Sequence, residues 1–158
     1  MFTMDDLFEI AIKMEKNGEN LYNDATKKIH NNELKSMLKW MAEEEVVHRR
    51  WFEGKKNKLS LELDETRLKK MVPKVLQDMM GEKTLSLDDI NFSEMTKISQ
   101  LLETFIGFEN DTILFYELLE MFIEEEKVIK GLKNIISEEK NHIKKLNTMM
   151  ESLLEESI

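Results

Sequence analysis

The stretch Met41-Ala42-Glu43-Glu44-Glu45-Val46-Val47-His48 carries two polar residues at positions where a helix would normally carry apolar ones. Apolar side chains recur on both sides of it at steps of three and four residues, which is the spacing of one helix face. Glu45 and His48 fall in the same row, three residues apart, and therefore project from that face. The pattern predicts a helix whose buried face holds a carboxylate and an imidazole. The apolar members of the row are Leu34, Leu38, Met41 and Phe52.

Three further segments show the same periodicity, and a charged or imidazole side chain interrupts each of them. They run over residues 8–29, 98–123 and 128–153. The interrupting residues are Glu15, Glu109, and the pair Glu139 and His142, in that order. Five glycines and one proline are too few for the tight turns of an all-β protein. The sequence therefore predicts an all-α protein with polar residues in its core.

The chain repeats this pattern at an offset of 94 residues. Each half carries a Glu, a Tyr seven residues later, and a Glu-x-x-His that starts thirty residues after the first Glu. Glu makes up 24 of the 158 residues. Two Glu-x-x-His motifs that each have a Glu thirty residues before them therefore arise by chance roughly 0.1% of the time. The corresponding residues are Glu15 and Glu109, Tyr22 and Tyr116, Glu45 and Glu139, and His48 and His142.

The spacing of thirty residues has a geometric meaning. An antiparallel hairpin that turns near His30 places Glu15 level with Glu45, and a turn over residues 122–125 does the same in the second half. Thr3 or Asp5 can cap the first helix, and Asn31-Asn32 can open the second. Ser93 is the expected cap of the third. Four carboxylates and two imidazoles are then expected at one height inside a helix bundle.

The connection between the two halves is long. Residues 57–92 can run the full height of a bundle, and within them residues 64–80 read as a short helix interrupted near Pro73. Two helical hairpins joined by one long crossover form the ferritin-like arrangement of a four-helix bundle. We expect one domain over residues 1–158, with hairpins at about 3–56 and 93–155.

Composition excludes several classes of protein. The net charge of −9 argues against a nucleic-acid binder. The absence of cysteine excludes disulfides, thiolate zinc sites, iron–sulfur clusters and a cysteine nucleophile. No apolar run approaches the roughly 18 residues of a membrane span, and the N-terminus has early acids and no basic region. We therefore expect a soluble, cytoplasmic protein without a membrane or nucleic-acid partner.

Electrostatics favour metal ions at the cluster. Four buried carboxylates repel one another and must bind protons or cations. Two divalent ions supply four positive charges, and a shell rich in oxygen with one imidazole per ion suits iron or manganese better than zinc. Two such ions with open positions can bind O₂ or peroxide.

Three strings resemble the rubrerythrin-type proteins of the ferritin-like di-iron carboxylate superfamily. The resemblance covers residues 5–56 and 95–150. It implies two iron ions, or a manganese-containing pair, with Glu15 and His48 on one ion, Glu109 and His142 on the other, and Glu45 and Glu139 bridging. The strings are Met14-Glu15-Lys16-Asn17-Gly18 through Tyr22, Glu43 through His48, and Glu109 through Phe115-Tyr116.

The resemblance implies an oxidoreductase, with a role in oxidative stress, that reduces peroxide or O₂ or oxidises Fe²⁺. Two features depart from the family. Rubrerythrins carry a rubredoxin domain, whereas this chain has no cysteine, so we expect a separate electron-donor protein. Rubrerythrins also place a Glu three residues after the ligand of the third helix, where this chain has Thr112. Without that Glu, a symmetric set of six ligands is closer to the ferroxidase type.

Two other functions stay open: a metal-handling or sensor protein with little turnover, and a helical interaction protein without metal. Exposed apolar residues favour a homodimer. Tyr22 and Tyr116 lie one heptad from Glu15 and Glu109, so their hydroxyls are expected to support ligand carboxylates. Glu19 is expected to be a non-ligand.

Overall fold

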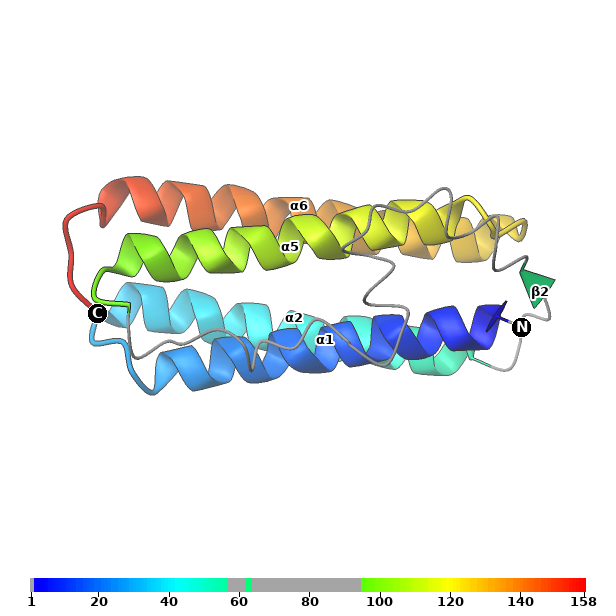
Figure 1. Ribbon diagram of the computed structural model, residues 1–158, viewed down its shortest axis with the longest axis horizontal. Helices are drawn as coiled ribbons and strands as arrows, with labels where there is room; N and C mark the ends of the chain where they lie inside the picture. The colour runs from blue at the N-terminus through cyan, green and yellow to red at the C-terminus, as the bar shows by residue number, and fades with distance from the viewer. Residues whose placement is uncertain (1, 57–61, 64–94) are drawn as a thin grey trace.

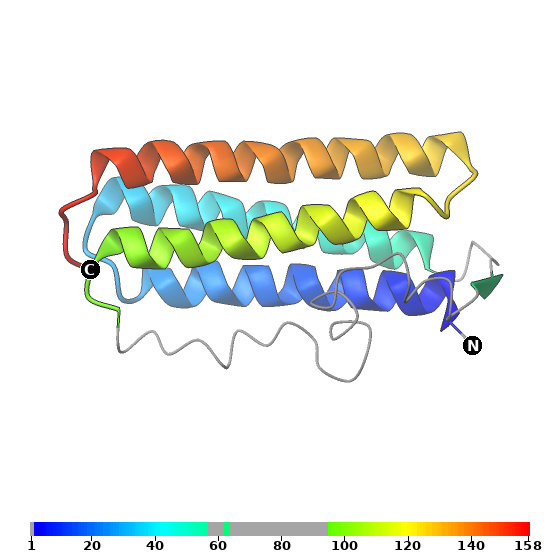
Figure 2. The ribbon, with the colours of Figure 1, turned by 45° about the horizontal axis from the view of Figure 1, so that its top comes forward.

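Four long helices dominate the computed structural model, which describes residues 2–56, 62–63 and 95–158. Figures 1 and 2 show α1 beside α2 and α5 beside α6, as two antiparallel hairpins packed against each other. The predicted four-helix bundle is confirmed. The two-residue strands β1 (Phe2–Thr3) and β2 (Glu62–Leu63) pair antiparallel at one end. The helices are α1 (Met4–Thr26), α2 (Asn32–Lys55), α5 (Ile98–Glu120) and α6 (Glu126–Ser152).

Side-chain caps fix where the first two helices begin. The Thr3 hydroxyl accepts the N–H of Asp6 at 3.2 Å, and the Asp6 carboxylate accepts the N–H of Thr3 at 2.9 Å. This reciprocal pair satisfies two backbone donors that the first turn leaves free. Asn31 caps α2 by accepting the N–H of Leu34 at 2.9 Å. The predicted caps at Thr3 and Asn31 are confirmed.

The third helix begins later than predicted. Ser93 lies outside the described residues, and the residue that precedes the first turn of α5 is Lys97. The side-chain oxygen of Gln100 accepts the N–H groups of Thr96 and Lys97 at 3.0 and 3.1 Å. Gln100 thus accepts the two N–H groups just before the helix, and α5 begins after Lys97, so the prediction of a Ser93 cap is wrong.

The direction of the helices explains the long connection. The turns over residues 27–31 and 121–125 lie at opposite ends of the bundle, and α2 ends at the end opposite to where α5 begins (Figure 1). The chain must therefore travel the length of the bundle between them. The helix predicted over residues 64–80, with Pro73, lies outside the described residues. His30 is exposed in the first turn, as expected.

Apolar side chains form two clusters that are separated along every helix. One contains Phe8, Phe52 and Phe115, toward the 121–125 turn. The other contains Leu34 and Phe105, toward the 27–31 turn. Between them lies a layer of buried polar residues, so the layer is shielded from water on both sides along the bundle axis.

Candidate metal centre

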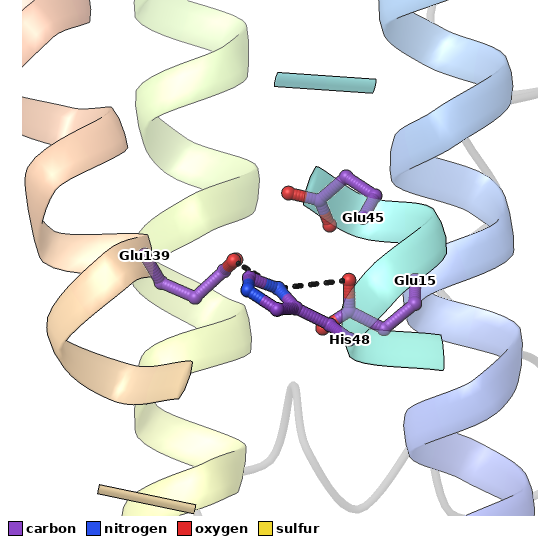
Figure 3. Close-up of side chains that lie close together, drawn as sticks. All are labelled: Glu15, Glu45, His48 and Glu139. Atoms are coloured by element: carbon purple, nitrogen blue, oxygen red, sulfur yellow. Dashed lines mark ion pairs between the residues drawn. The ribbon is translucent and has the colours of Figure 1, made fainter. Parts of the chain in front are cut away.

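The six predicted ligands converge in the layer between the two apolar clusters. Each of the four helices contributes, and none of the six side chains exposes more than 1% of its surface. Figure 3 shows His48 lying between the carboxylates of Glu15 and Glu139, with Glu45 above. The structure brings the whole predicted set together. The six residues are Glu15, Glu45, His48, Glu109, Glu139 and His142.

Within the described part of the chain, these residues form two overlapping groups. Glu15, Glu45, His48 and Glu139 make the first, and Glu45, Glu109, Glu139 and His142 make the second. In each group one potential ligand atom per residue lies within 4.8 Å of all the others. Glu45 and Glu139 belong to both groups. That sharing is what two neighbouring ions with two bridging carboxylates require.

Both histidines turn the same ring nitrogen toward the cluster. Nδ1 of His48 lies 3.5 Å from Oε2 of Glu15 and 2.9 Å from Oε1 of Glu139. Nδ1 of His142 lies 3.3 Å from Oε1 of both Glu45 and Glu109. The two rings lie 6.2 Å apart in a stacked arrangement.

The other ring nitrogen of each histidine contacts a glutamate that we did not predict. Nε2 of His48 lies 2.5 Å from Glu138, and Nε2 of His142 lies 3.2 Å from Glu44. Such a contact fixes the orientation and tautomer of an imidazole whose Nδ1 is to bind a metal. The signal was present in the sequence, because Glu44 and Glu138 also correspond at the offset of 94. Of the acidic run Glu43–Glu45, only Glu45 was predicted to reach the cluster.

The two tyrosines cross between the hairpins. The hydroxyl of Tyr116 donates to Oε1 of Glu15 at 2.5 Å, and the hydroxyl of Tyr22 donates to Oε1 of Glu109. Each tyrosine therefore supports the carboxylate of the other half, rather than the glutamate on its own helix. Both tyrosines are fully buried. Their predicted role beside the carboxylates agrees with these contacts.

Several buried atoms of the cluster make no hydrogen bond of acceptable geometry with the described residues, although Nδ1 of His48 and Oε1 of Glu139 lie within ion-pair distance of each other. Both carboxylate oxygens of Glu45 and of Glu139 are among them, together with one oxygen each of Glu15 and Glu109 and Nδ1 of His48. Buried polar atoms are normally satisfied, so such a concentration calls for a ligand. Oxygen-rich donors with two imidazoles fit two divalent ions of the iron or manganese type.

Burial and mutual repulsion set the protonation of the cluster when it holds no ions. Burial first, and then the neighbouring carboxylates, raise the pKa of Glu45 and Glu139 well above 4.5. Burial by itself would lower the pKa of the histidines. Contacts with Glu139 and Glu15 outweigh it and raise the pKa of His48 to about 12, and contacts with Glu109 and Glu44 raise that of His142 to about 9. Protons therefore take the place of cations in the metal-free protein.

These shifts predict how the stability of the metal-free protein depends on pH. Groups whose pKa is raised by folding stabilise the fold below their unfolded pKa and lose that contribution as pH rises through the folded value. Above about pH 6.5 the melting temperature should therefore fall steadily up to pH 9, because the unfolded chain loses its imidazole protons near pH 6.5, whereas folded His142 holds its proton up to about pH 9. Thermal melts in chelator check this. A melting temperature that rises over that range would contradict it.

Metal binding has the opposite dependence on pH. Bound ions require deprotonated ligands, so the affinity for ions increases as pH rises. The difference in melting temperature between the loaded and metal-free protein should therefore widen from pH 6.5 to 9. Burial raises the pKa of Glu109, but contacts with Glu139 and His142 outweigh burial and lower it. Glu109 therefore titrates only in the acid range and does not change the expected result between pH 6.5 and 9.

Gly18 leaves room for one of the shared carboxylates. A Cβ atom at this position would lie 2.9 Å from Oε2 of Glu45 and 3.1 Å from the ring of Phe108. Gly18→Ala should push the Glu45 carboxylate out of place and weaken metal binding about tenfold, the lower end for perturbing a ligand's support. Gly107→Ala in α5 is the matched control, since a Cβ there meets nothing within 4 Å. Metal titration of both variants checks this; equal affinities would contradict it.

The crossed tyrosines predict which residues are coupled energetically. In the metal-free protein, Tyr22→Phe and Glu109→Gln should be non-additive by roughly 0.5–3 kcal/mol, because they remove the same hydrogen bond. Tyr22→Phe and Glu15→Gln should be nearly additive, although both residues lie on α1. Denaturant unfolding of the single and double variants measures the two couplings. A larger coupling between Tyr22 and Glu15 would contradict the crossed arrangement.

Two polar residues near the cluster belong to neither group. Glu19 forms an ion pair with Arg49 and lies 3.4 Å from Lys16, so two cations hold its carboxylate outside the cluster. Thr112, at the position where the family carries a Glu, is buried and donates its hydroxyl to the Phe108 carbonyl at 3.0 Å. The structure thus places six inner side chains, and no seventh from these two positions, in the cluster.

The fold and the cluster define a carboxylate protein of the ferritin-like class: an antiparallel four-helix bundle with glutamates and histidines gathered in its core. A sequence model of the rubrerythrin family matches residues 6–150. The chain therefore belongs to the rubrerythrin family.

Two solved structures share this fold. One is a Thermotoga maritima protein provisionally described as a ferritin-like diiron-carboxylate protein. It is 22% identical, with a TM-score of 0.67, and the match covers 94% of each chain. The other is a hypothetical protein from Pyrococcus furiosus, 21% identical, with a TM-score of 0.66 and coverage of 97% of this chain and 91% of that one. No protein of curated function matches the sequence significantly.

No described helix combines the length and apolar character that a membrane span needs.

Proposed function

We propose that this protein is a di-iron oxidoreductase that reduces peroxide or O₂, or that oxidises Fe²⁺ as its substrate. The observation that supports this most directly is the sharing of Glu45 and Glu139 by both groups of potential ligands. Two iron ions held there, with Glu15 and His48 on one and Glu109 and His142 on the other, would supply electrons in pairs to a small oxidant.

The side chains around the ions would prepare the reaction. The carboxyl groups of Glu45 and Glu139, whose pKa is raised, release protons when cations arrive. Burial and the nearby glutamates raise the pKa of Tyr22 and Tyr116 well above 10, so both remain neutral O–H donors at neutral pH. They hold Glu109 and Glu15 in place. The apolar clusters on either side keep bulk water away from the reacting groups.

Peroxide becomes two molecules of water by taking up two electrons and two protons. The 158 residues include no cysteine that could hold a rubredoxin iron. We propose that the electrons that restore the reduced centre come from outside these residues, from a donor protein.

Peroxide titration of the ferrous protein tests this proposal. In protein loaded anaerobically with Fe²⁺, one molecule of peroxide should oxidise each pair of iron ions. The optical spectrum of the protein monitors this oxidation. O₂ in the same experiment should react more slowly if peroxide is the substrate. Glu45→Ala, which should not retain the ion pair, is the control. Stoichiometric metal that peroxide and O₂ leave ferrous would contradict the oxidoreductase and favour a metal-handling or sensor protein.

A further inference from the structure

The two halves of the centre differ in how firmly they hold their histidines. The ring of Trp40 meets the ring of His142 edge-on, with 5.4 Å between centroids and 78° between planes. At the offset of 94 residues, the position that corresponds to Trp40 is Asn134. The repeat therefore gives His142 an aromatic neighbour that it does not give His48. Lys145 lies 5.3 Å from the centre of the Trp40 ring and covers it from outside.

The outer glutamates differ in the same sense. Glu44, which contacts His142, exposes 21% of its side chain, whereas Glu138, which contacts His48, exposes 50%. The Glu138 contact is the shorter of the two, but water competes more strongly for a half-exposed carboxylate. The tyrosine hydrogen bonds are present in both halves and so do not distinguish them.

The layer next to the cluster differs as well. One turn beyond Glu15, Glu19 pairs with Arg49, and both side chains keep 18–19% of their surface exposed. The corresponding positions in the second half are Ile113 and Ile143, which belong to or pack against the apolar core. The half with His48 thus borders a polar, partly exposed ion pair, and the half with His142 borders apolar side chains.

We propose that the ion held by His142 and Glu109 binds first and more tightly, and that the ion held by His48 and Glu15 is the exchangeable one. This inference rests on the two-ion centre proposed above. Trp40 is a positioning residue: it restricts the His142 ring before the ion arrives, which lowers the entropic cost of binding. The half that would hold the exchangeable ion is the one whose histidine contacts the more exposed outer glutamate, Glu138.

Titration of the metal-free full chain with Co²⁺ under nitrogen tests the order of binding. The Trp51→Phe variant leaves Trp40 as the only tryptophan, so its fluorescence reports on the His142 half. We expect most of the fluorescence change within the first equivalent, and a first ion that binds at least about tenfold more tightly than the second. The matched variants His48→Gln and His142→Gln assign the two steps. The first should keep the tight step and the second should lose it.

The role of Trp40 is tested by two replacements. Trp40→Phe keeps a ring edge against His142 and should keep most of the gap between the two affinities, whereas Trp40→Ala should narrow it with both ions still bound. Trp51→Phe, which leaves Trp40 in place, controls for general loss of packing. The Trp40 variants lack the fluorescent reporter, so the absorption of bound Co²⁺ follows their two binding steps. The inference would be overturned if the two ions bound with equal affinity. It would also be overturned if His48→Gln lost the tight step and His142→Gln kept it. Either result would leave the two-ion centre intact. A wild-type titration that ends at one ion would overturn the two-ion centre, and this order with it.

Discussion

Glu45→Ala should leave the protein unable to hold a pair of metal ions. Glu45 belongs to both groups of potential ligands, and neither of its carboxylate oxygens has a hydrogen-bond partner among the described residues. Its loss removes a ligand from both ions at once and leaves Glu139 as the only shared carboxylate. We expect the metal content to fall from two ions per chain to one weakly held ion or none. Elemental analysis after dialysis measures this.

Because the two halves of the centre correspond, four other glutamate variants can be compared with Glu45→Ala for their metal content. Glu139→Ala should be as severe as Glu45→Ala, whereas Glu15→Ala and Glu109→Ala each remove a ligand from one ion and should be milder. Glu19→Ala should retain two ions, because Glu19 pairs with Arg49 and belongs to neither group. A Glu45→Ala protein that still held two tight ions would show that the carboxylate does not bridge.

Removal of the metal should lower the melting temperature by roughly 15 °C or more. Ions that bind only the folded chain stabilise it by mass action, by about 4 kcal/mol each at a thousandfold excess over Kd. For a chain of this length each kcal/mol shifts the melting temperature by about 2–4 °C. Protons on Glu45 and Glu139 offset part of the loss. Thermal melts of the loaded and chelated protein at neutral pH measure the difference.

The control for this prediction is the Glu45→Ala variant, whose melting temperature should hardly respond to chelator. Equal melting temperatures for the loaded and chelated wild type, in protein shown to bind two ions, would mean that the ions bind outside the core.

The sequence was enough to predict the four helices and the six inner side chains, because both depend on local periodicity. Polar residues interrupt the apolar row of each helix, and they do so in both halves at an offset of 94. Side chains on the buried faces of all four helices must meet in the core of the bundle. The contacts between hairpins were harder to predict. Nothing in the spacing says that Tyr22 reaches Glu109 rather than Glu15, since that depends on how the hairpins dock.

Other features were missed for local reasons. Glu44 and Glu138 stand in acidic runs whose composition suggests solvent; the repeat pairs them, but their distances from the histidine rings are what reveal their role. The start of α5 was misplaced because the residue that precedes it is Lys97, which makes no side-chain cap hydrogen bond that the sequence could signal. The contact of Trp40 with His142 has no counterpart in the repeat, so a search for symmetry passes over it.

The contacts that cross between the hairpins also suggest an ancestry. One hairpin contains a complete half of the chemistry: a Glu, a Tyr and a Glu-x-x-His with its outer Glu. Its Tyr22 and Glu44, however, serve residues of the other hairpin. Two copies of a chain about one hairpin long, related by a twofold axis, would complete each other in the same way. The present protein has the form of such a symmetric dimer made continuous, and Trp40 and the Glu19–Arg49 pair are places where its two halves differ.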